Sequence, residues 1–141
     1  MGLSHSQTNV LYHNLRKKVI QITQTVGYIT DHIQQLLGYH ISGDTNIYLG
    51  PSNIAHMQSK HPQDYQKYGQ YIQSILSAPD YVGMNPSDSS IEYVKEFNIN
   101  NEYVKVAVRI SSGGKYYARS LYVLNNNRVQ NFINKGTLKH V

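Results

Sequence analysis

A short glycine-containing turn constrains this chain more than any other local feature. Residues 112–115 (Ser-Gly-Gly-Lys) separate two segments, 103–111 and 116–124, that are rich in β-branched and aromatic residues. A turn of this type between such segments predicts a tight β-hairpin. The turn also fixes which residues face each other, and the expected register places Val104 opposite Val123.

Alternation of side chains along this hairpin gives it one apolar face and one basic face. The basic face is expected to collect Lys105, Arg109, Tyr116, Ser120 and Tyr122. In the same register Val108 faces Arg119, so Arg119 lies at the margin of the apolar face or the register differs there. If a preceding strand turns at residues 100–101, Glu92 faces Arg109, either as an ordinary cross-strand ion pair or as a general base.

The rest of the second half describes an α+β unit. Strands are expected at residues 46–49 and 91–98, and helices at 51–60, 62–77 and 128–135. Proline at a first helical position and proline just beyond a helix explain several of these boundaries.

The N-terminal quarter has a different pattern. Apolar residues repeat at spacings of four and three over residues 12–36, and Gly38 follows them. This heptad pattern predicts a long helix that either pairs with a second chain as a homo-oligomer or lies on its own domain. We therefore expect an assembly or linker segment at 1–40 and a separate domain at 41–141. The predicted fold is α+β, with an N-terminal long helix and two short helices packed on an antiparallel sheet of about four strands.

Composition excludes several classes of protein. The chain has no cysteine, which excludes disulfides and thiolate zinc sites. It also lacks a run of roughly eighteen apolar residues and a cleavable signal segment. We therefore expect no membrane partner and a soluble protein, either cytoplasmic or delivered into a target cell.

Charge is distributed unevenly along the chain. The formal net charge is +5, and no acidic residue follows Glu102. The basic residues after that point are Lys105, Arg109, Lys115, Arg119, Arg128, Lys135 and Lys139. Such a region is typical of a surface that binds a polyanion such as RNA through its phosphate groups, although an ordinary solvated face has the same pattern.

Two histidines and a lysine, His56, Lys60 and His61, lie within six residues. One imidazole can accept the proton of a ribose 2′-hydroxyl and another can protonate the leaving 5′-oxygen, while a cation stabilises the charge on phosphorus. This chemistry needs neither a metal nor a cofactor, and the five-residue spacing of the histidines argues against zinc. On an ideal helix His61 lies about 140° away from His56, so His61 could instead cap the next helix.

Three short motifs occur in a characteristic order, at residues 56–62, 75–82 and 119–122. In this order they resemble the nucleases of phages and mobile elements that are grouped with barnase, EndoU, colicin-type tRNases and RelE. The resemblance covers residues 47–123 and implies a metal-independent ribonuclease, often used as a toxin. It implies that His56, Lys60, His61, Ser120 and Tyr122 belong to the active site.

The resulting hypothesis is an endoribonuclease that leaves a 2′,3′-cyclic phosphate and a 5′-hydroxyl, with RNA, tRNA included, as its substrate. The expected catalytic residues are His56, Lys60, His61, Arg109, Ser120 and Tyr122, and the expected substrate-binding residues are Lys105, Tyr116 and Arg119. An acidic immunity protein or antitoxin is the expected protein partner. The alternatives are a non-catalytic nucleic-acid-binding module and a structural phage protein.

Overall fold

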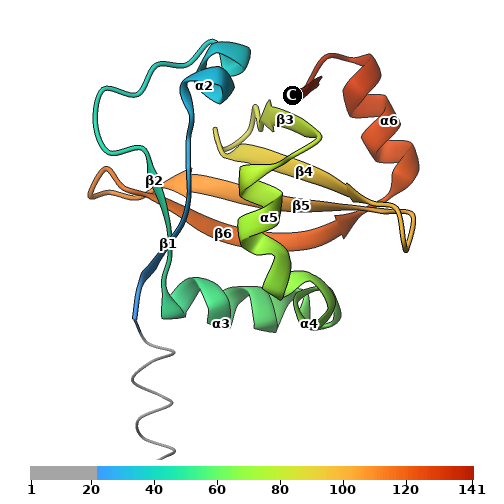
Figure 1. The fold of residues 1–141 in the computed structure, drawn as a ribbon, viewed down its shortest axis with the longest axis horizontal. Coiled ribbons are helices and arrows are strands. Elements are labelled where there is room, and N and C mark those ends of the chain that lie inside the picture. The colour runs from blue at the N-terminus through green and yellow to red at the C-terminus, as the bar shows by residue number, and fades with distance from the viewer. Residues whose placement is uncertain (1–21) are drawn as a thin grey trace, which may run out of the picture.

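The computed structural model describes residues 22–141, which form one seven-stranded mixed sheet with helices on both faces (Figure 1). The strands are β1 (Gln24–Tyr28), β2 (Asn46–Leu49), β3 (Tyr81–Met84), β4 (Ile91–Phe97), β5 (Glu102–Ile110), β6 (Tyr116–Leu124) and β7 (Leu138–His140). The helices are α2 (Asp31–Leu37), α3 (Pro51–Lys60), α4 (Pro62–Tyr68), α5 (Ile72–Ser77) and α6 (Asn126–Asn134), with a 3₁₀ turn, η1, at Gly69–Tyr71.

The strand order is β1-β2-β6-β5-β4-β3-β7. An antiparallel meander from β3 to β6 forms its centre, and β7 extends it on the far side of β3. On the other side β2 runs parallel to the beginning of β6, and β1 pairs antiparallel with β2. The sheet is therefore mixed, and its centre is built from strands that are neighbours in the sequence.

The architecture is α+β, but the predicted sheet of about four strands behind an N-terminal long helix is wrong. Residues 24–28 form β1, and the helix that ends at Gly38 begins only at Asp31. Thr25 and Val26 are β-branched and favour a strand, and a Cβ atom on Gly27 would lie 3.1 Å from Leu76 Cβ, so this strand approaches α5 closely. The part of the heptad pattern before residue 22 lies outside the described residues.

The central hairpin confirms part of the predicted register. Val104 pairs with Val123, and Gly114 has the positive φ (81°) that its turn requires. The predicted pairing of Val108 with Arg119 is wrong, because a β-bulge pairs Val108 with the residue before Arg119. The bulge makes Arg119 the extra residue of its strand and leaves it exposed.

The β4–β5 register also differs from the prediction. The connection is a longer turn over residues 98–101, and it pairs Glu92 with Ala107 rather than with Arg109. Lys105 therefore lies diagonally across from Glu92 on the same face, within reach of a long side chain.

The helix expected at residues 62–77 is interrupted by η1, which begins at Gly69. Glycine is a weak helix former, and the side chain just before it is held from outside the helix. Tyr68 donates a hydrogen bond to Glu102 (2.8 Å) and accepts one from Asn100 (3.2 Å), which fixes α4 to the β4–β5 turn.

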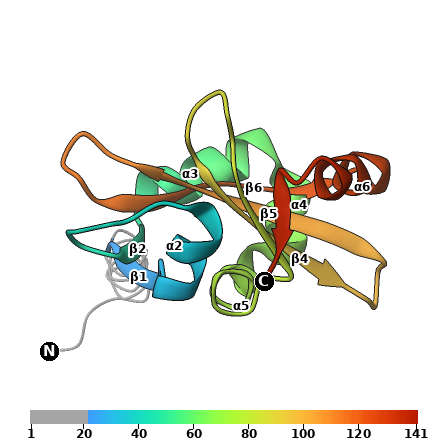
Figure 2. The same cartoon turned by 90° about the horizontal axis from the view of Figure 1, so that it is seen from above.

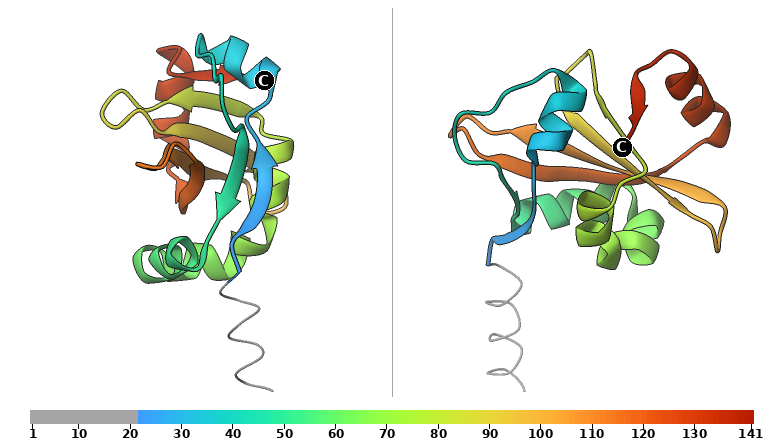
Figure 3. Two further views of the ribbon diagram at one scale, coloured as in Figure 1. Left: turned by 90° about the vertical axis from the view of Figure 1, so that its left-hand side faces the viewer. Right: turned by 45° about the horizontal axis from the view of Figure 1, so that its top comes forward.

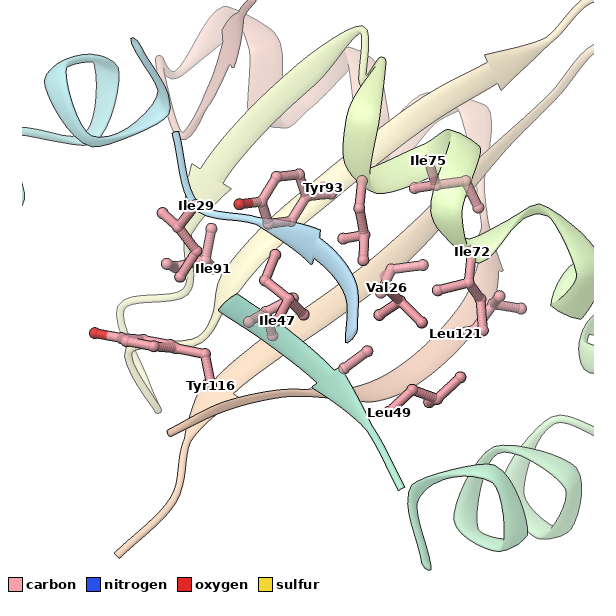
Figure 4. Packing of buried hydrophobic residues seen from close by; sticks show 14 of the residues in the cluster. Val26, Ile29, Ile47, Leu49, Ile72, Ile75, Ile91, Tyr93, Tyr116 and Leu121 are labelled. Carbon is pink, nitrogen blue, oxygen red and sulfur yellow. The ribbon is translucent and has the colours of Figure 1, made fainter. Parts of the chain in front are cut away.

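The main core lies between the sheet and helices α2 and α5, and Met57 of α3 reaches it from beside β6. Figure 4 shows Val26, Ile29 and Ile47 meeting Ile72, Ile75 and Leu121 there. A smaller apolar cluster on the other face seats α6 against Val94 and Leu124. Viewed from above, α2 and α5 lie on one side of the sheet, while α3 and the β3–β4 connection project on the other (Figure 2). That second face is therefore only partly covered.

A deletion tests whether β1 and α2 are integral to the fold. Removing residues 1–38 takes away one strand and the buried side chains of Val26, Ile29 and Ile33. Each such loss costs about 2–5 kcal/mol, so the deleted chain should show no cooperative thermal unfolding by circular dichroism. A chain that begins at residue 22 keeps every element described above and serves as the control. A cooperative transition after the longer deletion would show that the N-terminal quarter is separable.

Candidate functional site

The partly covered face of the sheet collects polar side chains from three adjacent strands. We call this the polar face and define it by Glu92, Lys105, Arg109, Ser120 and Tyr122. Figure 3 (left) shows the β3–β4 connection and α3 projecting from this side of the sheet, opposite to α5. The polar face lies on the side of the sheet from which these two segments project.

An ion pair between Glu92 and Lys105 lies at the centre of the polar face. Glu92 is 9% exposed and Lys105 8% exposed, so both charges are nearly removed from water. Burial disfavours the ammonium, but hydrogen bonds to Glu92 and Tyr122 more than compensate, and the pKa of Lys105 is raised above its ordinary value. A buried ion pair adds little net stability compared with apolar side chains, which makes a functional role the better explanation for it.

Tyr122 connects this ion pair to a histidine. The Lys105 Nζ atom lies 4.6 Å from the centre of the Tyr122 ring, a cation–π distance. The His61 ring is stacked on the same tyrosine, with ring centres 4.8 Å apart and planes inclined by 27°. A titratable imidazole, a phenol, an ammonium and a carboxylate therefore form a continuous row.

The junction between α3 and α4 holds His61 in this position. His61 lies between the two helices, as the C-cap of α3 and the N-cap of α4, and Pro62 occupies the first position of α4. Asp64 accepts a hydrogen bond from the Val123 backbone N–H (3.0 Å), which fastens α4 to the edge of β6. Because Tyr122 neighbours Val123, the same bond fixes the histidine over the tyrosine.

Asp88, on the β3–β4 connection, approaches the other end of the polar face. Hydrogen bonds from the Ser90 hydroxyl (2.6 Å) and backbone N–H (3.0 Å) keep its pKa low, and the charges of Arg109 and Lys105 lower it further. Within residues 22–141, Arg109 forms no ion pair within 4 Å. Its guanidinium is thus available to a bound phosphate.

A cleft adjoins the polar face at the N-terminal end of α3. It has a volume of about 540 Å³, and His56, Tyr117 and Arg119 are among the residues that line it. His56 and Arg119 are both exposed, and the bulge in β6 turns Arg119 out of the sheet towards this cleft. The cleft and the polar face therefore meet along β6.

The structure brings most of the predicted site residues together. Arg109, Lys105, Ser120 and Tyr122 share the polar face, and His61 covers it. His56 and Arg119 line the neighbouring cleft, whereas Lys60 is exposed on the last turn of α3 and lines a shallow hollow of about 260 Å³ beside His61.

Tyr116 does not belong to this group. It is 5% exposed, packs in the main core on the opposite face, and shares a hydrogen bond with the Tyr39 hydroxyl (2.9 Å). The expectation that it lies beside Lys105 is wrong, because the bulge shifts the alternation between Tyr116 and Ser120 by one residue.

Sequence reasoning missed Asp88 and misassigned the partner of Glu92. Asp88 lies in a polar loop whose composition predicts a turn and nothing about what it approaches. The pairing of Glu92 with Lys105 depends on where the β4–β5 turn is centred, and a turn centred one residue later, at residues 100–101, would have placed Glu92 opposite Arg109.

Within residues 22–141, no group of three or more histidine, aspartate or glutamate residues is arranged to hold a metal ion. In the same range, no helix has the length and apolar character needed to cross a membrane.

Comparison with known proteins gives one match. A family model described as phage-Barnase-EndoU-ColicinE5/D-RelE like nuclease3 matches residues 23–131. No curated protein and no solved structure was found to match. The matched range begins just before β1 and ends within α6, so it includes the polar face and the cleft.

The buried ion pair can be tested through stability. Glu92→Gln leaves the Lys105 ammonium buried without its partner, and we expect a loss of about 3 kcal/mol in the free energy of unfolding. The double variant Glu92→Gln/Lys105→Met should recover most of that loss in urea unfolding. Lys67→Met breaks the exposed pair with Glu102 (2.5 Å) and is the matched control, expected to have a much smaller effect. Equal losses for both single variants would contradict the burial argument.

Proposed function

The chain belongs to the family of phage-Barnase-EndoU-ColicinE5/D-RelE like nucleases, and from this premise we propose that it is a metal-independent endoribonuclease acting at the polar face. The family supports nuclease activity in general. Three further points are proposals about this chain: RNA as the substrate, the 2′-hydroxyl as the nucleophile, and a toxin role.

The proposed reaction is an internal transesterification. The ribose 2′-oxygen attacks phosphorus while a base accepts the 2′-proton, the bond from phosphorus to the 5′-oxygen breaks, and an acid protonates that oxygen. The products are a 2′,3′-cyclic phosphate and a 5′-hydroxyl. His56 and His61 are the proposed base and acid, with either order compatible with the geometry.

The spacing of these two histidines supports the proposal. They are five residues apart, which corresponds to a rise of about 7.5 Å along a helix axis, more than the width of a phosphate group. Ser120 lies between the Tyr122 end of β6, where His61 stacks, and the Arg119 end, where the cleft containing His56 begins. A phosphate bound over Ser120 would therefore have one imidazole towards each end.

Cations of the polar face would stabilise the pentacoordinate intermediate. The raised pKa of Lys105 keeps its ammonium charged at neutral pH, and Glu92 holds it in one position. Arg109 adds a guanidinium whose planar fork suits two phosphate oxygens. Charge that is fixed before the substrate arrives needs no reorganisation during the reaction, which is how electrostatic catalysis gains its effect.

One observation carries the proposal: the stacking of His61 on Tyr122, whose ring also covers Lys105. If His61 only capped a helix, it would have no reason to stack on a tyrosine ring that also contacts a buried ammonium. The row joins an imidazole, which can donate or accept a proton, to a fixed positive charge, and phosphodiester cleavage without a metal uses both.

Activity in EDTA tests the mechanism. Purified protein should cleave RNA in excess EDTA and leave 2′,3′-cyclic phosphate ends, detected by end-group analysis. His61→Ala and His56→Ala should each lower the rate by roughly a hundredfold or more, the effect of losing a general acid or base. His32→Ala changes an exposed histidine on α2 and should leave the rate unchanged. A requirement for a divalent ion, or full activity in His61→Ala, would refute the mechanism.

A toxin of this kind needs an inhibitor in its own host, and we propose an acidic protein that covers the polar face. Arg109, Arg119 and Lys115 form no ion pair within the described residues, so their charges remain available to an acidic partner. Carboxylates can occupy the positions that RNA phosphates take, because an arginine fork binds both groups. Association should be fast at low ionic strength and slow as salt is added.

A charge-reversal variant tests whether RNA and the inhibitor bind to the same surface. Arg109→Glu should reduce RNA cleavage and the affinity for a candidate inhibitor together, each by at least about tenfold, in kinetic and surface-plasmon measurements. Lys139→Glu is the control, because Lys139 is exposed and donates to the Leu36 carbonyl of α2, which packs on the opposite face of the sheet. An inhibitor that binds Arg109→Glu as tightly as the unchanged protein must bind elsewhere.

A further inference from the structure

The cleft at the N-terminal end of α3 has the features of a nucleotide pocket. It is lined by Ser52, Asn53, His56, Ser111, Tyr117 and Arg119, among others. Its volume of about 540 Å³ lies within the range of small-ligand sites. Of the residues that line it, the mechanism above uses only His56.

The Tyr117 ring supplies a flat surface in this cleft that is held in place. It is half-buried and packs against the Tyr48 ring, with ring centres 5.8 Å apart and planes inclined by 44°. The Tyr48 hydroxyl in turn donates a hydrogen bond to Asp44 (2.6 Å). An aromatic ring fixed in this way offers a surface for stacking by an unpaired base at little entropic cost.

Three polar groups of the cleft, on Asn53, Ser111 and Arg119, can present hydrogen-bond donors to a ligand. Asn53 uses its carboxamide oxygen to accept the Gly50 backbone N–H (2.8 Å), which leaves its NH₂ group as the part that can face a ligand. The Ser111 hydroxyl oxygen accepts from the Lys115 backbone N–H (3.3 Å), so its own hydrogen remains available. Arg119 is a donor only. A ligand that fits this set presents acceptors.

We propose that this cleft binds the nucleotide next to the scissile phosphate in single-stranded RNA and prefers a keto base, guanine or uracil. Guanine O6 and uracil O4 are acceptors at the positions where adenine and cytosine carry amino groups, so the keto bases offer these three donors one more acceptor. The inference rests on the proposed cleavage at the polar face. Tyr117 and Ser120 are three residues apart on β6, about 10 Å, so the two sites are adjacent.

Mononucleotides provide a test that does not depend on catalysis, because they contain no bond to cleave. Unchanged protein is titrated with GMP, UMP, AMP and CMP by two-dimensional amide NMR. We expect shifts at the amides of Ser52, Ser111 and Tyr117, and GMP or UMP binding at least about fivefold more tightly than AMP and CMP. Tyr117→Leu should weaken GMP and UMP binding roughly tenfold or more, as expected for a lost base stack. Tyr28→Leu, at an exposed tyrosine on β1, is the matched control.

The possible results distinguish failure of the proposed nucleotide cleft from failure of the proposed nuclease function. Arg119 is exposed on a bulge, so Arg119→Gln keeps the test valid if Tyr117→Leu proves unstable, and it should also weaken binding. Binding of all four nucleotides with equal affinity, inorganic phosphate binding as tightly as GMP, or shifts confined to other residues would each overturn the inference. Nucleotide binding in the cleft together with no cleavage of any RNA would support the cleft and refute the proposed function instead.

Discussion

The structure depends on the antiparallel pairing of β5 and β6. These two nine-residue strands alternate strictly enough to place valines on one side and charged or hydroxyl groups on the other. The valines form the floor of the main core, against which the helices pack. The other side, which no helix fully covers, becomes the polar face. One pairing therefore determines both the core and the candidate site.

The same pairing explains how much could be predicted from the sequence. Where structure follows from local chemistry, the expectations were accurate. β2, α3 and β6 have the predicted bounds, and the half of the hairpin far from its turn has the predicted register. A bulge cannot be read from alternation, because it adds one residue without any distinctive composition. It moved Tyr116 from the expected basic face into the core, and Arg119 from the margin of the apolar face into solvent.

Secondary-structure elements that depend on contacts between distant parts of the chain were not predicted from the sequence. β1 and β7 are edge strands of five and three residues, held by pairing with segments far away in the sequence. The spacing of Val26, Ile29 and Ile33 fits one face of a helix as well as a strand followed by a helix, and only the packing of α5 decides between them. In the candidate site the residue types were predictable, but the contact between His61 and Tyr122 requires the α3–α4 junction to reach the edge of β6.

The parallel contact between β2 and β6 has a kinetic consequence. It joins Ile47 to Tyr116, so a long stretch of chain must be closed into a loop before the pairing contributes any stability. The meander from β3 to β6 has only short connections and can form first, at low contact order. In this order the floor of the polar face forms early, and its histidines arrive with α3 and α4. The pairing of β7 with β3 also closes a long loop, so by the same argument both edges of the sheet form after the meander.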